Sequence, residues 1–372
     1  MSQPISRRVF ISRLLAVSTA GAALGASGCA AKPAAAPPTA APAATAVPPT
    51  IVPTTVPATA IPPTTIPPTA VPPTIVPTTV PPTATAVAKV AAPTATAAPA
   101  SAAYLAVAKG ANADPGEITR RAIAALGGIE RFVKKGADVI IKPNVCTAYY
   151  GFEYAATTNP QVVAAIVQLC LGAGAKRVRV MDFPFGGTAQ ASYEKSGIAT
   201  AVKTAGGVLE AMSNMKYRDV EIPQGKRLKQ WKVYGDILDA DVVINVPIAK
   251  DHSGARLTLG MKNLMGVVLD RNGMHSRGLH QSIADLNTVV RPQLTIVDAI
   301  RILTDNGPTG GNLNDVKKLD TIIASADVVA ADAFATTLFG LKPADIDYIR
   351  FGAEMGLGKM DLNAIKIEQV TV

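Results

Sequence analysis

The chain has 372 residues and a formal net charge of +9, from 36 lysines and arginines against 27 acids. Five of the basic residues and none of the acids precede residue 104, so residues 104–372 carry a net charge of only +4. That balance excludes the strongly basic surface of a nucleic-acid-binding protein. The same 269 residues are enough for one large or two modest domains with a well-buried core.

Residues 1–29 have the pattern of an export signal. Arg7 and Arg8 precede a mildly apolar stretch, which is typical of a twin-arginine signal and too short for a membrane-spanning helix. Residues 26–29, Ala-Ser-Gly-Cys, resemble a lipobox in which Cys29 is lipidated, although cleavage without a lipid is the alternative. We therefore expect passage through the twin-arginine translocase and an extracytoplasmic position, anchored to the cell membrane or surface by Cys29.

Residues 30–103 form a low-complexity linker of alanine, proline, threonine and valine that holds 19 of the chain's 29 prolines. The sequence VPPTIVPTTVP occurs twice, at residues 47–57 and 71–81. Proline fixes φ and removes backbone donors, which favours polyproline II over helix or sheet. We predict a disordered stalk that carries the domain formed by residues 104–372.

Short apolar runs alternate with amphipathic stretches throughout residues 104–372. This alternation predicts an α/β fold, with a mostly parallel, Rossmann-like sheet and helices on both faces. A basic stretch at residues 216–232 predicts an inserted, exposed β-hairpin. The expected strands are 105–108, 138–141, 177–181, 241–246, 294–297, 319–324 and 364–370, and the main expected helices are 114–127, 158–172, 193–205, 279–290, 326–339 and 346–355.

Residues 241–266 hold the densest group of candidate functional side chains. We expect Pro247 to end a buried strand, a polar turn with Ser253 as N-cap to follow, and a helix to start at Leu257. Lys250 and Lys262 would then flank a strand end and a helix start, which suits a bound anion. The alternative is that both lysines are merely solvated.

Polar side chains also follow other expected strands, and parallel sheets bind ligands at the carboxyl ends of their strands. The sequence therefore predicts that six side chains lie together at one rim of the sheet, where the carboxyl ends of the strands meet: Lys142, Asn144, Asp182, Lys250, His252 and Asp298. We expect ligand contacts from Lys142, Asn144, Asp182, Thr258, Lys262 and Asn263.

An enzyme with this rim would use lysines to hold the charge of a carboxylate or phosphate. His252 would be the acid or base, because its unperturbed pKa lies nearest neutrality. Lys250 would act beside it, and Asp298 or Asp182 would orient His252 or bind a metal. A non-catalytic ligand-binding lipoprotein would hold the same ligand without turnover.

A metal site is a further alternative, because all three histidines, His252, His275 and His280, fall within 29 residues. The competing interpretation is that these histidines are hydrogen-bonded or exposed and bind no metal. Cys146 and Cys170 either pair after export or remain free thiols. Zinc-ligand spacing is absent from the sequence.

These motifs resemble the family known as domain of unknown function 362. The family pattern, Pro-x-x-Lys-x-His followed by Thr and Lys-Asn-x-x-Gly, is matched by Pro247, Lys250, His252, Thr258, Lys262, Asn263 and Gly266. The resemblance continues through Lys142-Pro143-Asn144 and Asp298. It implies no agreed reaction, but relatives with ferredoxin-like cysteine clusters suggest redox or metal work. This chain has no such cluster, so an accessory role in an iron–sulfur or redox system is only an alternative.

Overall fold

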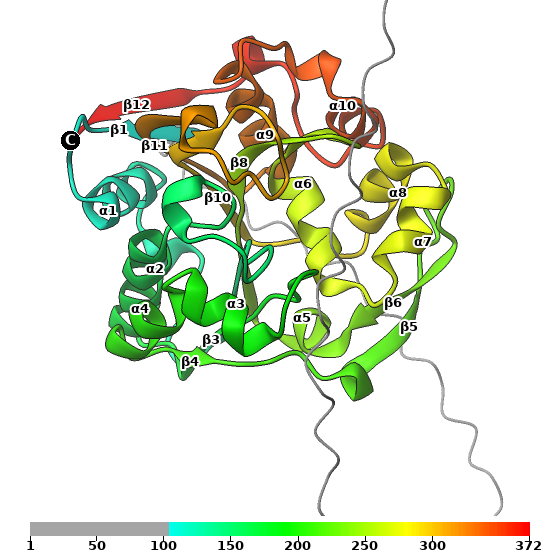
Figure 1. Cartoon of the computed structure of the whole chain (residues 1–372), viewed down its shortest axis with the longest axis horizontal. Helices are drawn as coiled ribbons and strands as arrows, with labels where there is room; N and C mark the ends of the chain where they lie inside the picture. Colours follow the sequence, from blue (N-terminus) through cyan, green and yellow to red (C-terminus); the bar gives the residue numbers. More distant parts are fainter. Residues whose placement is uncertain (1–103) are drawn as a thin grey trace, which may run out of the picture. The chain divides into compact units, whose positions relative to one another are not determined.

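The computed structural model describes residues 104–372 (Figure 1). The expected export signal, Cys29 and the linker lie outside the described residues. The described part is an α/β domain built on a mixed sheet, as predicted. The strands along the sheet, from one edge to the other, are β12 (Ile367–Thr371), β1 (Leu105–Lys109), β11 (Val316–Ser325), β10 (Leu294–Leu303), β7 (Val242–Val246), β2 (Asp138–Pro143), β3 (Arg177–Val180) and β4 (Val208–Leu209).

Parallel pairing dominates this sheet. β2 pairs in parallel with β3 and β7, β7 with β10, and β3 with β4. Only β11 runs against the other seven strands of this order, since it is antiparallel to both β1 and β10. The mostly parallel sheet inferred from the alternating pattern is therefore confirmed.

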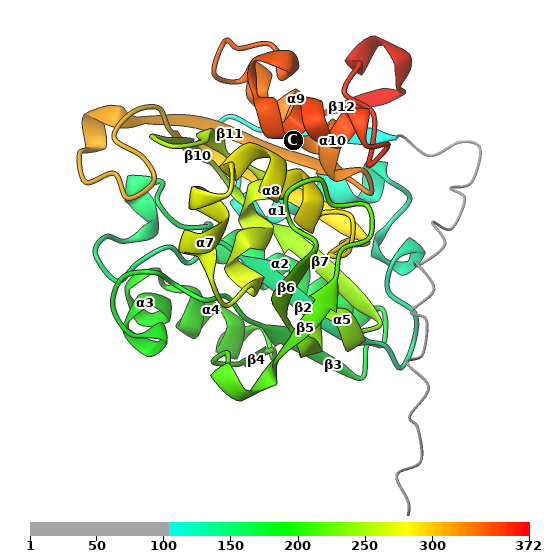
Figure 2. The ribbon, with the colours of Figure 1, turned by 90° about the vertical axis from the view of Figure 1, so that its right-hand side faces the viewer.

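Helices cover both faces of the sheet (Figures 1 and 2). Successive residues of a strand point to opposite faces, and β2 shows this directly. Ile140 packs in one apolar core, whereas Val139 and Ile141 pack in the other. One face carries α1 (Pro115–Ala125), α2 (Pro160–Gly172) and α4 (Ile198–Thr204); the other carries α6 (Gly260–Asn263), α8 (Leu279–Leu286), α9 (Val328–Thr337) and α10 (Asp347–Glu354).

Local sequence signals set several helix starts. Asp114 caps α1 by accepting a hydrogen bond from the Glu117 amide at 3.0 Å, with proline as the first helical residue. Asn159 caps α2 in the same way, again before a proline. A capping side chain and an N1 proline satisfy or remove amides that would otherwise lack acceptors. Across residues 104–372, no helix is long and apolar enough to cross a membrane.

The expected single helix over residues 193–205 is wrong. The structure has two helices, α3 (Ala189–Lys195) and α4, separated at Gly197, whose φ of 77° interrupts the helix. The predicted basic hairpin is present as β5 (Tyr217–Glu221) and β6 (Gln230–Tyr234). Two short helices were not expected, α5 (Gly235–Asp239) and α7 (Arg271–Ser276).

The chain does not leave the sheet at Pro247, which corrects a second expectation. β8 (Ile248–His252) follows at once, pairs with β10, and forms a hairpin with β9 (Arg256–Thr258). Proline lacks an amide but keeps its carbonyl, which accepts from the Asp298 amide at 2.8 Å. Ser253 therefore lies in a hairpin turn, and the helix begins at Gly260 rather than Leu257.

The order of the strands reverses between β2 and β7. From β2 the chain proceeds outward through β3 to β4, and then returns to place β7 on the other side of β2. Open α/β sheets bind ligands in the crevice beyond the carboxyl ends of strands at such a switch point. The fold thus directs attention to the ends of β2 and β7.

Candidate functional site

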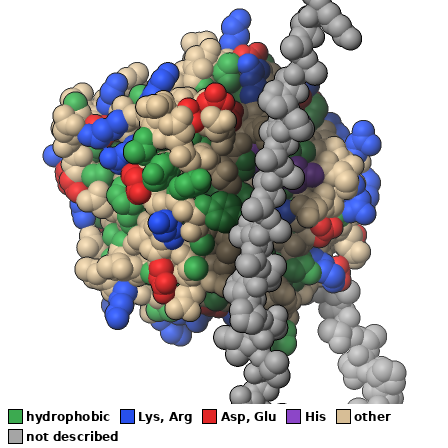
Figure 3. All heavy atoms as spheres, in the orientation of Figure 1, with side chains coloured by type: hydrophobic (Ala, Val, Ile, Leu, Met, Phe, Trp, Pro, Cys, Tyr) green, Lys and Arg blue, Asp and Glu red, His purple; other side chains and the backbone are tan. Residues whose placement is uncertain are grey.

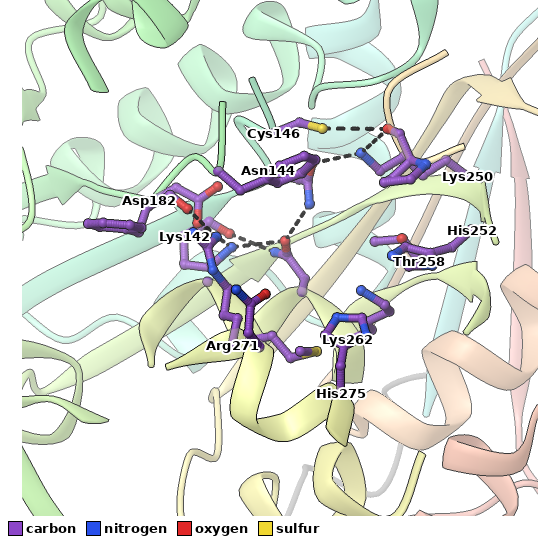
Figure 4. A pocket seen from close by; sticks show the side chains of 17 residues that line it. Lys142, Asn144, Cys146, Asp182, Lys250, His252, Thr258, Lys262, Arg271 and His275 are labelled. Atoms are coloured by element: carbon purple, nitrogen blue, oxygen red, sulfur yellow. Dashed lines mark hydrogen bonds and ion pairs between the residues drawn. The ribbon is translucent and has the colours of Figure 1, made fainter. Parts of the chain in front are cut away.

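A cavity of about 230 Å³ opens at the carboxyl ends of β2 and β7 (Figure 4). It brings together every residue expected at the rim except Asp298. Five of its lining side chains are charged: Lys142, Asp182, Lys250, Lys262 and Arg271. Its other lining residues are Asn144, Cys146, Phe183, Phe185, His252, Thr258, Asn263, Met265, Gly266, Asn272, His275 and Pro308.

Four cations therefore face one carboxylate inside this cavity. On the face in Figure 3, by contrast, basic side chains are dispersed among acidic and apolar ones. The concentration of positive charge belongs to the cavity rather than to that surface. Low dielectric surroundings strengthen its attraction for an anion.

Lys142, at the end of β2, has its charge balanced within the protein. Its Nζ lies 2.7 Å from Asp182 Oδ1 and donates to Asn263 Oδ1 at 2.9 Å. Asp182 Oδ2 in turn accepts from the Val145 amide at 2.8 Å. Burial lowers the pKa of Lys142, while Asp182 acts in the opposite direction. The pair is nearly fully buried, so Lys142 has little charge left to offer a ligand.

Lys250, from β8, has hydrogen-bond partners but no countercharge. Its Nζ donates to the carbonyls of Ala156 at 2.6 Å and Pro308 at 2.8 Å, and to Asn144 Oδ1 at 3.2 Å. Within residues 104–372 it forms no ion pair with a carboxylate. Protein oxygens thus use all three N–H donors of the ammonium, while its positive charge beside the cavity stays without a countercharge.

Lys262, from α6, is the most unusual of the cations. Its side chain is 9% exposed, and it makes no hydrogen bond or ion pair with any other described residue. Burial first, and the nearby Lys250 ammonium second, lower the pKa of Lys262 to about 7. An amine with this pKa is partly neutral at physiological pH, which equips it both as a base and as a nucleophile.

Asp332 of α9 fixes the start of the short helix that carries Lys262. Its two carboxylate oxygens accept from the amides of Gly260 at 2.6 Å and Met261 at 2.8 Å. Burial raises the pKa of Asp332 to about 8. Four-residue α6 is thereby anchored to the α9 helix.

Asn263, next to Lys262, links the two strand ends. Its Oδ1 accepts from Lys142 and from Asn144 Nδ2 at 3.0 Å, and its Nδ2 donates to Asn245 Oδ1 at 2.8 Å. Asn263 therefore organises the cavity floor, and its polar atoms are occupied by protein partners. Thr258 differs, because its buried Oγ1 has no hydrogen-bond partner in the described part of the chain.

His252 is held as a neutral donor. Its Nδ1 accepts from the amides of Gly254 at 2.9 Å and Ala255 at 3.2 Å, which assigns the ring proton to Nε2. Burial, then Lys262 and Lys250, lower the pKa of His252 to about 3. The choice of His252 as acid or base used its unperturbed pKa, which this buried imidazole does not keep.

Asp298 does not line the cavity, contrary to expectation. It is fully buried within β10, where its carboxylate accepts from the amides of Asn159 at 2.7 Å and Ile300 at 3.0 Å. Burial raises the pKa of Asp298 to about 6. Asp298 supports the start of α2 instead of orienting His252, and Asp182 is likewise paired with Lys142.

The three histidines do not converge. The rings of His252 and His275 stack with centroids 6.3 Å apart, but His280 stacks on Tyr348 at 6.2 Å. Among residues 104–372, no three side chains of His, Cys, Asp or Glu are grouped so as to hold a metal ion. Cys146 and Cys170 are both buried free thiols.

Arg271 is the one charged cavity residue that the sequence did not predict. Arg271 of α7 donates to the Phe183 carbonyl at 2.6 Å, and its guanidinium lies 5.0 Å from the Phe183 ring centroid. No local pattern marks this arginine. Gly266 had a signal in the Lys-Asn-x-x-Gly motif, and the structure gives its reason. A Cβ on Gly266 would lie 2.6 Å from Lys142 Nζ and would also strike Asp182.

These features define an α/β domain with a small cationic pocket at the switch point of its sheet. The family model described as domain of unknown function 362 (DUF362) matches residues 139–337. That match covers more than half of the chain, and the protein belongs to the DUF362 family. The matched residues include β2, β7 and α6, and so the elements that form the pocket.

The thylakoid-associated protein sll1697 of a Synechocystis strain is 31% identical over 253 residues, which cover 64% of this chain and 74% of that protein. Solved structures with some similarity include the lactate racemase apoprotein of Thermoanaerobacterium thermosaccharolyticum, at 11% identity and a TM-score of 0.37 over 60% of this chain and 54% of that one. A Thermotoga maritima protein gives 12% identity and a TM-score of 0.39 over 61% and 60% of the two chains. This chain thus spans less than two thirds of either solved protein.

Proposed function

We propose that the domain formed by residues 104–372 binds a small anion, a carboxylate or a phosphate, in the cavity at the ends of β2 and β7. The observation that carries this proposal is the uncompensated charge of the pocket. Within residues 104–372, Asp182 balances Lys142, whereas Lys250 and Arg271 form no ion pair and the Lys262 amine has no hydrogen-bond partner. A buried charge is costly unless it is paired, so a bound anion would supply what these side chains lack.

The size of the cavity limits the ligand. Its 230 Å³ is smaller than the roughly 300–1,000 Å³ of pockets that hold drug-sized molecules. A ligand of a few carbon atoms, or a phosphate, fits this volume. The unpartnered Thr258 hydroxyl supplies a neutral donor beside the cations.

We favour an enzyme over a capture protein because two ionisable groups of the pocket have strongly shifted pKa values. Such shifts gather where groups take part in proton transfer or nucleophilic attack. Lys262, with a pKa of about 7, is the candidate base or nucleophile, and His252 is a neutral donor through Nε2. In a capture protein the same groups would hold the anion without turning it over.

The test is a thermal-shift series on the purified chain with phosphate, acetate, oxalate and citrate, against matched chloride at constant ionic strength. A specific rise in melting temperature with one anion supports the proposal, since a ligand that binds only the folded state stabilises it. Identical curves for all salts would remove it. Native mass spectrometry of protein purified from its own host would also detect any small molecule or metal that stays bound.

The sequence of residues 1–103 supports a second proposal, which concerns the location of the protein. Export by the twin-arginine route and lipidation at Cys29 would place the domain outside the cytoplasm on a proline-rich stalk. Metabolic labelling with a fatty acid tests this directly. The label should appear on the chain and vanish in Cys29→Ser, while replacement of Arg7 and Arg8 by lysine should hold the precursor inside the cell.

A further inference from the structure

Three primary amines line the cavity, and only one is free to react. Lys142 is paired with Asp182, and Lys250 donates to three oxygens. Lys262 has neither an acceptor nor a countercharge in the described part of the chain, although its side chain is nine-tenths buried. Burial disfavours a charged amine, and neither a hydrogen-bond acceptor nor a carboxylate stabilises the charge here. Of the three amines, Lys262 is therefore the one whose neutral form is favoured.

Most of the charged groups around Lys262 lower its pKa. The pKa of Lys262 is lowered by Lys250 from β8, Arg271 from α7 and Lys142 from β2, and it is raised by the Cys146 thiol. Lys262 in turn lowers the pKa of both His252 and His275. A lysine desolvated beside other cations is activated as a nucleophile toward carbonyl compounds.

We propose that Lys262 Nζ forms an imine with the carbonyl group of a small 2-oxo acid bound in this cavity. The inference rests on the proposed anion site and names its substrate class. The carboxylate of the 2-oxo acid would face the charges of Lys250 and Arg271. The carbonyl carbon, next to that carboxylate, would then come within reach of Lys262.

The step balances without any further reactant. The lone pair of the neutral amine forms the C–N bond as the C=O π bond breaks, and the first nitrogen proton passes to the oxygen, which becomes the hydroxyl of a carbinolamine. Loss of that hydroxyl with the second nitrogen proton gives the C=N bond and one water, and nothing is oxidised or reduced. The Thr258 hydroxyl and the Nε2–H of His252 are the uncommitted neutral groups that can hydrogen-bond to the departing oxygen.

The cavity and its donors match a short 2-oxo acid better than they match phosphate. The volume of about 230 Å³ suits a chain of two to five carbon atoms. Phosphate would accept hydrogen bonds from Lys262 and Thr258, but it offers no carbonyl carbon for a neutral amine to attack. A carbonyl group beside the anionic group gives both a function.

The experiment traps the imine. The full chain is incubated at pH 7 with cyanoborohydride and, in turn, glyoxylate, pyruvate, oxaloacetate or 2-oxoglutarate, then digested and mapped by mass spectrometry. With at least one acid, we expect a reduced adduct at Lys262 that forms at least ~10-fold faster than any at the exposed Lys203, because its lower pKa leaves more neutral amine. The labelling rate should rise as the pH passes through 7.

Lys262→Arg keeps the charge but removes the primary amine, so the adduct should disappear while Lys203→Arg retains it. Binding of the same acids, and of lactate as a carbonyl-free control, is measured in parallel by calorimetry. If the acids and lactate bind but no acid labels Lys262, the imine is wrong and the anion site stands. If none of them binds and none labels Lys262, the anion site fails as well. Uniform labelling of Lys203 and Lys262 also overturns the inference.

Discussion

Lys142 Nζ and Asp182 Oδ1 lie 2.7 Å apart at the carboxyl ends of two neighbouring parallel strands, and the pair is almost completely buried. This ion pair divides the cations of the pocket into two kinds. Lys142 serves the protein, because its countercharge is internal. Lys250, Lys262 and Arg271 are left to serve a ligand. The sequence predicted that these strand ends meet, but not that one expected anion-binding lysine is already neutralised.

Gly266→Ala should destabilise the domain by about 3 kcal/mol, since the added Cβ forces Lys142 away from Asp182 and breaks a buried pair. Urea unfolding followed by circular dichroism measures the change. Gly172→Ala is the matched control, because a Cβ there meets nothing within 4 Å. Equal stability of the two variants would show that the close contact at Gly266 is not needed.

Lys262→Met should leave the domain folded and make it more stable near pH 7. The folded-state pKa of Lys262, about 7, is below its unfolded value of 10.5, so the unfolded state binds more protons between these values. Stability of the wild type should therefore rise by about 2 kcal/mol from pH 7 to pH 9 through this group. Urea titrations at both pH values should show this gain in the wild type and its absence in the variant. If the free energy of unfolding changed equally with pH in both proteins, the lowered pKa of buried Lys262 would be wrong.

Asp298→Asn should cost about 1–3 kcal/mol, because one of two backbone amides loses its carboxylate acceptor. The folded pKa of about 6 lies above the unfolded value of 3.8, so stability from this group is full below pH 4 and declines as the pH rises to 6. The variant should lack that decline. Asp219→Asn, in an exposed ion pair with Lys232, is the control and should change stability little. Anion binding should survive in Asp298→Asn, since Asp298 does not line the cavity.

His252 should remain neutral above about pH 4, because burial and two nearby ammonium groups lower its pKa to about 3. Nuclear magnetic resonance of imidazole-labelled protein should show ring shifts of His252 that are constant from pH 5 to pH 8, with the proton on Nε2. His252→Gln identifies that signal by removing it. A His252 that titrates near pH 6.5 would restore its role as an imidazolium acid.

Much of the fold followed from local patterns. Asp114 and Asn159 before prolines marked two helix starts, and apolar runs marked the strands on which the rim depends. The rule that ligands gather at the carboxyl ends of parallel strands then brought Lys142 and Lys250, which lie far apart in sequence, to one cavity.

The errors came from long-range packing. The chain continues past Pro247 as β8 because β8 pairs with β10, and no local pattern in the sequence predicts that pairing. Asp298 follows an apolar run like a strand-end residue, yet β10 extends five residues beyond it and buries it. Arg271 reaches the cavity only because α7 packs there, which no spacing predicts.

The most direct test of the account is calorimetric titration of the best-stabilising anion into wild type, Lys262→Met and the charge-matched control Lys203→Met. We expect one site per chain, affinity at least ~10-fold weaker in Lys262→Met, and no change in Lys203→Met. Affinity of the wild type should also fall as the pH rises from 6 to 8 and Lys262 loses its proton. Equal affinities in all three proteins at both pH values would show that the anion binds elsewhere and would contradict the pocket as the functional site.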